Sequence, residues 1–236
     1  MTRTKNMLLA VGAALLGTAA VAQDAPPPVV LPMPTTPPAG ATVLLSDDAG
    51  SAAANWYKRG SKDDCGWKLA DGCFTPDKND ITSKAEFGDV FVHLEFRCPA
   101  DAEGKPIGHG NAGIGFMGRY EVQIMNSFGV KQGIQDCAGF YNQKAARVNA
   151  CKPAGQWQAY DIFFRAPRFD ADGKVVEQAR ATVVQNGVIV MLNEDFKGPT
   201  GIQYGDFRGE VASAPFVLQG NHDLVSFRNI WAVPMP

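Results

Sequence analysis

The stretch VFVHLEFR at residues 90–97 alternates between two kinds of residue. Every second residue from Val90 onwards is apolar, whereas the intervening positions hold Phe91, His93, Glu95 and Arg97. A period of two is typical of a strand that buries one face in a core. The stretch therefore predicts a central strand of a sheet, with its polar side chains on the face away from that core.

The same kind of pattern recurs further along the chain. YEVQIM at residues 120–125 and QAYDIFFR at residues 158–165 are two more predicted strands. The dipeptide Asn186-Gly187 lies inside the apolar stretch 181–192 and indicates a two-residue hairpin turn. These segments place at least four strands in the middle of the chain.

The end of the chain and its composition complete this prediction. Residues 215–219 and 225–233 flank a polar turn and predict a closing hairpin. No segment keeps a helical apolar period over three turns, and 25 glycines and 16 prolines interrupt the runs. The sequence therefore predicts an all-β sandwich, open or jelly-roll-like.

The first 40 residues differ from the rest. Residues 1–22 carry two basic residues, a short apolar run and small residues at the end, which is typical of a signal peptide cleaved after Ala22. Residues 23–40 are proline-rich and predict an extended linker. The sandwich domain is then expected over residues 41–236, in a secreted or periplasmic protein with no membrane span.

Charge narrows the possible partners. The 236-residue chain has a formal net charge of −2, and loss of residues 1–22 leaves 20 basic against 24 acidic residues, a charge of −4. Nucleic acids and anionic membrane surfaces are bound by basic patches. The mild acidity therefore argues against both as partners.

Five cysteines lie in the expected mature chain. In an exported protein they can oxidise, and an odd number leaves at least one thiol over or paired outside the chain. Closeness along the chain favours Cys137–Cys151, with Cys65–Cys73 next, but it leaves the pattern open. Cys98 is interpreted as a small buried apolar residue.

Polar side chains on two of the predicted strands are candidates for chemistry. Glu95 and Arg97 alternate on one strand, and Glu121 and Gln123 alternate on another. If these strands are neighbours, one sheet face carries two carboxylates, a guanidinium and an amide. Such a face fits either a sugar-binding concavity or a solvated surface with a cross-strand ion pair. Conventional retaining glycoside hydrolysis needs two carboxyl groups about 5 to 5.5 Å apart, so it would require Glu95 as the partner of Glu121.

The glycine-rich stretch HGNAGIGFMGR at residues 109–119 lacks the context of a phosphate-binding loop. Its glycines are expected to let a strand bend and a ligand approach the backbone. His109 is a candidate general base or metal ligand, or a loop residue without a role, and Asn111 is a candidate rim contact. His93 is interpreted as a packing residue, and His222 lies in a predicted turn.

Several segments in order resemble a known family, the 3-keto-disaccharide hydrolase domain family, over nearly all of residues 41–236. The resemblance implies a concanavalin-like sandwich. The segments that carry it are Phe87-Gly88-Asp89 with HLEFR to Arg97, Gly110-Asn111-Ala112-Gly113-Ile114, GRYEVQI at residues 118–124, AGFY at 138–141, WQAYD at 157–161, FRAPRFD at 164–170, Asn186-Gly187 and VSFRNIW at 225–231.

The resemblance implies an enzyme of sugar breakdown. Its substrate would be a glycoside already oxidised to a ketone at carbon 3 by a separate sugar 3-oxidoreductase of the same pathway. The ketone acidifies the proton on carbon 2, so one base can start an elimination of the group on carbon 1, and water addition completes a net hydrolysis. Such a route needs one base and an oxyanion stabiliser. The alternative is a carbohydrate-binding sandwich domain without turnover.

The resemblance also leads to hypotheses about individual residues. Glu121 or His109 would take the carbon-2 proton, and Arg97 would stabilise the resulting oxyanion. A divalent metal held by Glu95 and Glu121 would be a possible aid, with no other cofactor expected. The predicted substrate-binding residues are Glu95, Asn111, Arg119, Gln123, Tyr141, His222 and Arg228, the last of which could instead be structural.

Two places depart from the family's usual pattern. The segment Leu218-Gln219-Gly220-Asn221-His222-Asp223 replaces an LQ-D-H-G pattern, so its histidine is shifted by one place. Asn126 stands where an aspartate is common. Both changes leave room for altered substrate choice or lost activity.

Overall fold

The computed structural model describes residues 29–48, 50–70, 72–202 and 209–236. The predicted signal peptide and its cleavage site lie outside these residues. No helix in the described part of the chain is long and apolar enough to cross a membrane.

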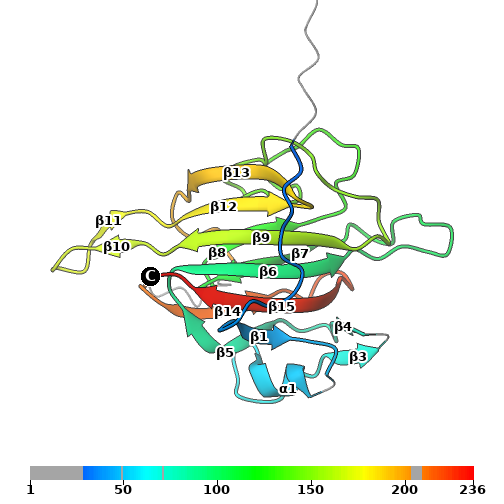
Figure 1. The fold of residues 1–236 in the computed structure, drawn as a ribbon, viewed down its shortest axis with the longest axis horizontal. Coiled ribbons are helices and arrows are strands. Elements are labelled where there is room, and N and C mark those ends of the chain that lie inside the picture. Colours follow the sequence, from blue (N-terminus) through cyan, green and yellow to red (C-terminus); the bar gives the residue numbers. More distant parts are fainter. Residues whose placement is uncertain (1–28, 49, 71, 203–208) are drawn as a thin grey trace, which may run out of the picture.

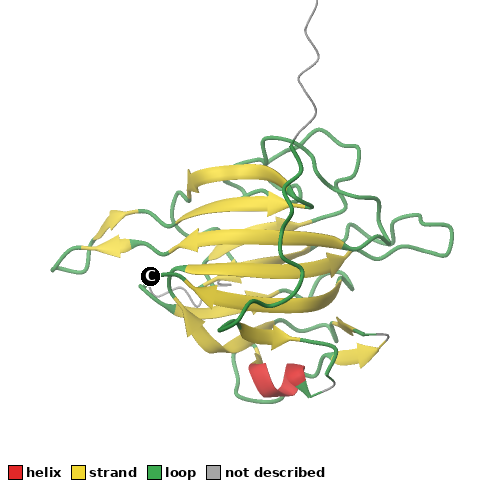
Figure 2. Ribbon diagram, viewed as in Figure 1, coloured by secondary structure: helices red, strands yellow, loops and turns green. Residues whose placement is uncertain are grey.

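Strands dominate the molecule, and they form two stacked antiparallel sheets (Figures 1 and 2). One short helix, α1 (Ser51–Asn55), and a two-stranded ribbon of β10 (Arg168–Phe169) and β11 (Val175–Glu177) stand outside these sheets. The larger sheet has the order β13 (Val188–Asp195), β12 (Arg180–Gln185), β9 (Gln158–Arg165), β6 (Val90–Arg97), β15 (Ser226–Pro234), β4 (Cys73–Thr75) and β3 (Lys68–Ala70), with β1 (Thr42–Leu45) also paired to β15.

The smaller sheet carries the glycine-rich strand. Its order is β2 (Trp56–Lys58), β5 (Ile81–Phe87), β14 (Ala214–Leu218), β7 (Ala112–Phe116) and β8 (Tyr120–Ile124). The prediction of an all-β sandwich is therefore confirmed.

The core lies between the two sheets and is rich in aromatic rings. Phe116 of the smaller sheet stacks on Phe164 of the larger sheet with 4.5 Å between ring centroids. Tyr120 contacts the same Phe164 ring at 5.6 Å, and both residues are fully buried. Successive side chains of a strand point to opposite faces of its sheet. The apolar residues that alternate along the strands of Phe164 and Tyr120 therefore fill the core, and the intervening residues face outwards.

Two predictions about strand pairing are wrong. The strands β14 and β15 do not form a closing hairpin, because β14 pairs with β5 and β7 whereas β15 pairs with β6, β4 and β1. The residues between them cross from one sheet to the other. Likewise β6 and β8 are not neighbours, since they belong to different sheets.

The proline-rich segment before β1 lies against the larger sheet. The Leu31 N–H donates to the Gly187 carbonyl at 2.7 Å, and the Asn229 amide donates to the Thr35 carbonyl at 2.7 Å. Figure 1 shows this blue segment running across the outer face of β12, β9 and β6 before it enters β1. Its described residues from 29 to 41 form no helix or strand, as the proline content predicts.

Candidate active site

The outer face of the smaller sheet presents Glu121 and Gln123. Both residues face away from the core because Tyr120, Val122 and Ile124 of the same strand fill it. Their direct partners on β7 are glycines. The Glu121 carboxyl lies over this bare stretch, so that a β-carbon added at Gly113 would be only 2.4 Å from Glu121 Oε1. The glycines thus make room for a carboxyl group at the surface of the sheet.

Glu121 is almost completely shielded from water, with 3% of its surface exposed. Burial disfavours the charged carboxylate, and the nearby negative charge of Asp80 adds to this effect. The positive charge of Arg59 opposes them only in part. Together they raise the pKa of Glu121 to about 8, which places it among the carboxyl groups suited to proton transfer near neutral pH.

A partly buried ion pair lies close enough to this carboxyl to act on its charge. Arg59 Nη1 lies 3.1 Å from Asp80 Oδ2, and Arg59 Nη2 donates to the Ile202 carbonyl at 2.6 Å. Asp80 Oδ1 also accepts the backbone N–H of Gly220 at 3.0 Å. Sequence reasoning missed Arg59 and Asp80. They come just after β2 and just before β5, and only the pairing of these strands brings the two residues together.

Gln123 lies between Glu121 and a pocket at the end of β8. Gln123 Nε2 lies 3.5 Å from Asn111 Oδ1 and donates to the Gln135 carbonyl at 3.3 Å. The pocket has a volume of about 640 Å³. The sequence-predicted residues Asn111, Gln123 and His109 therefore gather at the end of β8. The pocket is lined by His109, Met125, Asn126, Gly133, Ile134, Gln135 and Asp136.

Two long loops contact β8, one after the strand and one before β14. The Ala138 N–H donates to the Gln123 carbonyl at 2.9 Å, and the Tyr141 N–H donates to the Glu121 carbonyl at 3.3 Å. From the other loop, Thr200 Oγ1 accepts the Glu121 N–H at 3.0 Å. The backbone of Tyr141 is thereby placed beside that of Glu121.

Arg119 and His222 lie at the margins of this site. Arg119 is partly buried, and its guanidinium donates to the carbonyls of Gly209 and Met117, both at 2.6 Å. His222 is exposed. Its neighbour Asp223 accepts the backbone N–H groups of His109 at 3.0 Å and Asn111 at 2.8 Å, and so fixes the entry to β7. The sequence did not single out Asp223.

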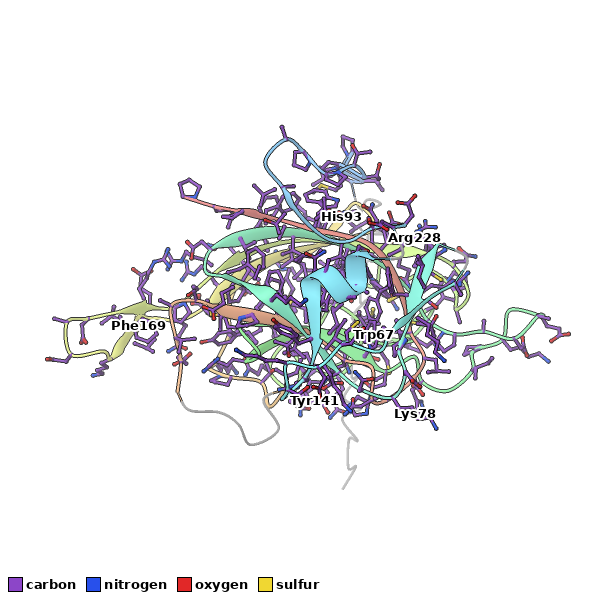
Figure 3. The ribbon with its side chains drawn as sticks, turned by 90° about the horizontal axis from the view of Figure 1, so that it is seen from below. Trp67, Lys78, His93, Tyr141, Phe169 and Arg228 are labelled. Atoms are coloured by element: carbon purple, nitrogen blue, oxygen red, sulfur yellow. The ribbon has the colours of Figure 1, made fainter. Side chains whose placement is uncertain are left out.

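Three predicted site residues lie on the opposite side of the molecule. Glu95 pairs with Arg228 at 2.7 Å on the outer face of the larger sheet, and Arg97 lies over Trp157 with 4.8 Å to the ring centroid. Figure 3 shows Arg228 at one surface of the sandwich and Tyr141 at the opposite surface.

The prediction that Glu95 and Arg97 share a face with Glu121 is therefore wrong, because β6 and β8 are in different sheets. The same geometry contradicts a metal held jointly by Glu95 and Glu121. Within the described ranges, no three or more His, Cys, Asp or Glu side chains form a group that could hold a metal ion.

The two-sheet sandwich thus carries one buried, protonatable carboxyl on the outer face of its smaller sheet, and a polar pocket lies at the end of the same strand. Residues 40–233 match the family described as "3-keto-alpha-glucoside-1,2-lyase-like domain". The chain belongs to this family, and it is an enzyme of that family's kind.

Solved structures agree with this assignment. The chain is similar to a "putative glycosyl hydrolase" from Parabacteroides distasonis ATCC 8503, with a TM-score of 0.71, 29% sequence identity and coverage of 90% of this chain and 94% of that one. A second structure with the same description and organism has a TM-score of 0.59 at 15% identity, covering 84% and 94% of the two chains, and it shows the fold alone. Among curated proteins no sequence matches significantly.

Proposed function

We propose that this enzyme cleaves 3-keto-glycosides, with Glu121 as the base that removes the proton on carbon 2. The observation that carries this proposal is the buried carboxyl of Glu121, whose pKa is raised to about 8. A base is most effective when its pKa lies near the working pH. At pH 7 about a tenth of the molecules carry an ionised Glu121 if its pKa is about 8. The carboxylate in those molecules is a stronger base than an ordinary carboxylate.

The proposed reaction has three steps: removal of a proton, loss of the group on carbon 1, and addition of water. Glu121 takes the carbon-2 proton, and the electron pair forms an enolate on the carbon-3 oxygen. The enolate then collapses, the bond between carbon 1 and its oxygen breaks, and the protonated Glu121 returns its proton to the leaving alcohol. Water adds across the resulting double bond to complete a net hydrolysis.

An oxyanion on carbon 3 needs a positive partner. Arg97 is too far away, since it lies on the other sheet over Trp157. Arg59 is the guanidinium whose charge acts on Glu121, and Asp80 holds it in position. We therefore assign the stabilising role to Arg59 in place of Arg97.

The pocket beyond Gln123 fits the leaving group. It combines apolar Met125 and Ile134 with amides, which suits the mixed faces of a sugar ring. The Asn126 Nδ2 atom in its lining is buried and has no hydrogen-bond partner among the residues that the structure describes. A sugar hydroxyl would supply that partner.

Two rival functions are less well supported. A retaining glycosidase needs a second carboxyl at about 5 to 5.5 Å, and Glu95, the candidate from the sequence, lies on the other sheet. A binding domain without turnover would have no use for a shielded carboxyl with a raised pKa, because sugar-binding carboxylates act as ionised acceptors. The burial of Glu121 therefore favours an enzyme.

The test of this proposal compares two chromogenic substrates. We expect the protein to release nitrophenol from a nitrophenyl 3-keto-glucoside and not from the unoxidised glucoside, because only the ketone acidifies carbon 2. Release should rise with pH up to about 8 as Glu121 ionises. Equal release from both substrates would contradict the elimination route, and saccharide binding without release would support the binding domain.

The glycines of β7 next to the Glu121 side chain lead to a second prediction. An added β-carbon at Gly113 would displace the Glu121 carboxyl, so Gly113→Ala should lower kcat on the keto substrate by about 100-fold. The matched control is Gly115→Ala on the same strand, where the β-carbon would be 2.6 Å from the flexible end of Ile202 and should cost far less. Thermal melts would establish that both variants fold. Equal losses of kcat in the two variants would contradict the assigned position of Glu121.

The proposed substrate indicates which reaction precedes this one, and the first residues indicate the compartment. A 3-keto-glycoside has to be supplied by an oxidoreductase that oxidises carbon 3 of a sugar. The signal-like residues 1–22 support export to the periplasm or the medium, where the two enzymes would act in sequence.

A further inference from the structure

Two buried cysteines face each other behind the loop that supports β8. The Gln185 Nε2 atom lies 3.4 Å from Cys137 Sγ and 3.3 Å from Cys151 Sγ. The two thiols are close enough for each to influence the ionisation of the other. All five cysteines are free thiols in the structure, so this contact is between two reduced side chains.

The sulfur of Cys137 has several polar neighbours. Its sulfur lies 3.0 Å from the Tyr160 hydroxyl, in addition to the contacts with Cys151 and Gln185. Burial works against ionisation, but the contacts with Cys151 and Gln185 oppose it, and the pKa of Cys137 is lowered. A thiolate is the form that attacks a disulfide.

We propose that Cys137 and Cys151 are a redox site, which a small-molecule disulfide such as oxidised glutathione converts to an intramolecular disulfide. One protein thiolate attacks the oxidant and releases one glutathione thiol. The second protein thiol loses its proton and attacks the mixed disulfide, which releases the second glutathione. Two protein thiols are oxidised, and one glutathione disulfide is reduced to two thiols.

Other cysteines are less suited to this pairing. Cys98 is close enough to both to affect their charges, but its thiol points to the Gly110 carbonyl at 3.7 Å. The Cys73 thiol donates to the Ala70 carbonyl at 3.2 Å. Among the cysteines of the described part of the chain, only Cys137 and Cys151 have sulfurs that contact the same side-chain atom, Gln185 Nε2.

The proposed disulfide closes the loop that positions the candidate site. Residues 137–151 form a 15-residue loop, and its first residues donate backbone hydrogen bonds to the carbonyls of Gln123 and Glu121. Closing a loop of this size restricts the unfolded chain. We expect the oxidised protein to melt roughly 6 to 12 °C higher than the reduced protein.

Peptide mapping tests the linkage directly in the full chain. Trypsin places Cys137 in residues 132–144, Cys151 in residues 148–165 and Cys98 in residues 98–119, because cleavage before proline does not occur. After equilibration with oxidised glutathione, a digest without reductant should yield peptides 132–144 and 148–165 joined, and reductant should separate them. Free thiols in both peptides, or a link from either to 98–119, would overturn the proposal.

Two variants keep the thermal test specific. Cys151→Ser should abolish the difference in melting temperature between oxidised and reduced protein, whereas Cys98→Ala should retain it. Cys98 is the matched control because it is buried in the same cluster. A difference that survives in Cys151→Ser would contradict the assigned pair. None of these measurements uses substrate turnover, so their outcome is independent of the proposed reaction.

Discussion

Replacing Glu121 by Gln is expected to lower kcat on a 3-keto-glucoside by a factor of about 10² to 10⁴, the usual contribution of a positioned base. The amide keeps the size of the side chain and the neutral state that burial favours, but it cannot accept the carbon-2 proton. Binding should change little, because the remaining contacts of the site are retained. The measurement is kcat and KM of the variant between pH 6 and 9.

The same variant has a second readout that does not depend on turnover. The pKa of Glu121 is raised from 4.5 to about 8, so its neutral form stabilises the native state fully below pH 4.5, and this contribution is lost as the pH rises through 8. The variant has no such loss. We expect similar unfolding free energies for the two proteins near pH 4.5 and a more stable variant at pH 9, by an amount on the order of 3–5 kcal/mol.

Gln123→Ala is the matched control, since Gln123 alternates with Glu121 on the same face. It should weaken substrate binding while leaving the pH dependence of stability unchanged. Full turnover by Glu121→Gln would rule out Glu121 as the base. Stability curves of identical shape for the variant and the wild type would show that Glu121 is not the buried, neutral group described above.

Local features were predictable from the sequence because they depend on few residues. The Asn186-Gly187 dipeptide predicts a hairpin, and it joins β12 to β13 with positive φ angles of 52° and 82°. Such a turn requires residues that tolerate the left-handed region. The strand 90–97 was also predicted with its observed bounds, because the alternation of its apolar residues is complete.

The membership of each sheet was not predictable in the same way. The strands β6 and β8 have the same alternation, and nothing in that alternation says which strand lies beside which. Glu95 and Glu121 were therefore expected on one face, although they lie on opposite sides of the sandwich. Arg59 and Asp80 were missed for the converse reason, since they carry no pattern and reach Glu121 only through tertiary pairing.

His93 shows how a prediction of packing can be correct and still incomplete. The residue is 1% exposed, as the prediction requires, and its ring stacks on Trp231 at 5.1 Å. It also hydrogen bonds to Asp161 at 2.8 Å, and its other nitrogen lies 3.7 Å from Glu95. Asp161 comes from β9, so this ionic cluster could not be found before the order of the strands was known.

Replacing Asp161 by Ala is expected to lower the free energy of unfolding by about 3–5 kcal/mol at pH 7, because it leaves a buried imidazolium without its closest partner. Burial alone would lower the pKa of His93, but the hydrogen bonds from Asp161 and Glu95 outweigh it and raise the pKa to about 9. His93 is therefore protonated in the folded protein at neutral pH. Urea unfolding of the wild type and the variant at pH 6, 7.5 and 9 measures the effect.

The pH dependence separates this ionic role from loss of packing. Because the pKa of His93 is raised in the folded protein, its protonation stabilises the native state fully below pH 6.5, the pKa of an unperturbed histidine. This stabilisation is lost as the pH rises to about 9. The cost of Asp161→Ala should therefore shrink from pH 6 to pH 9, whereas a cavity would cost the same at both. Glu95→Gln is the control, since the Glu95 side chain is 14% exposed and should cost less. A cost for Asp161→Ala that stays constant across this range would mean that His93 is neutral and that Asp161 acts only by filling space.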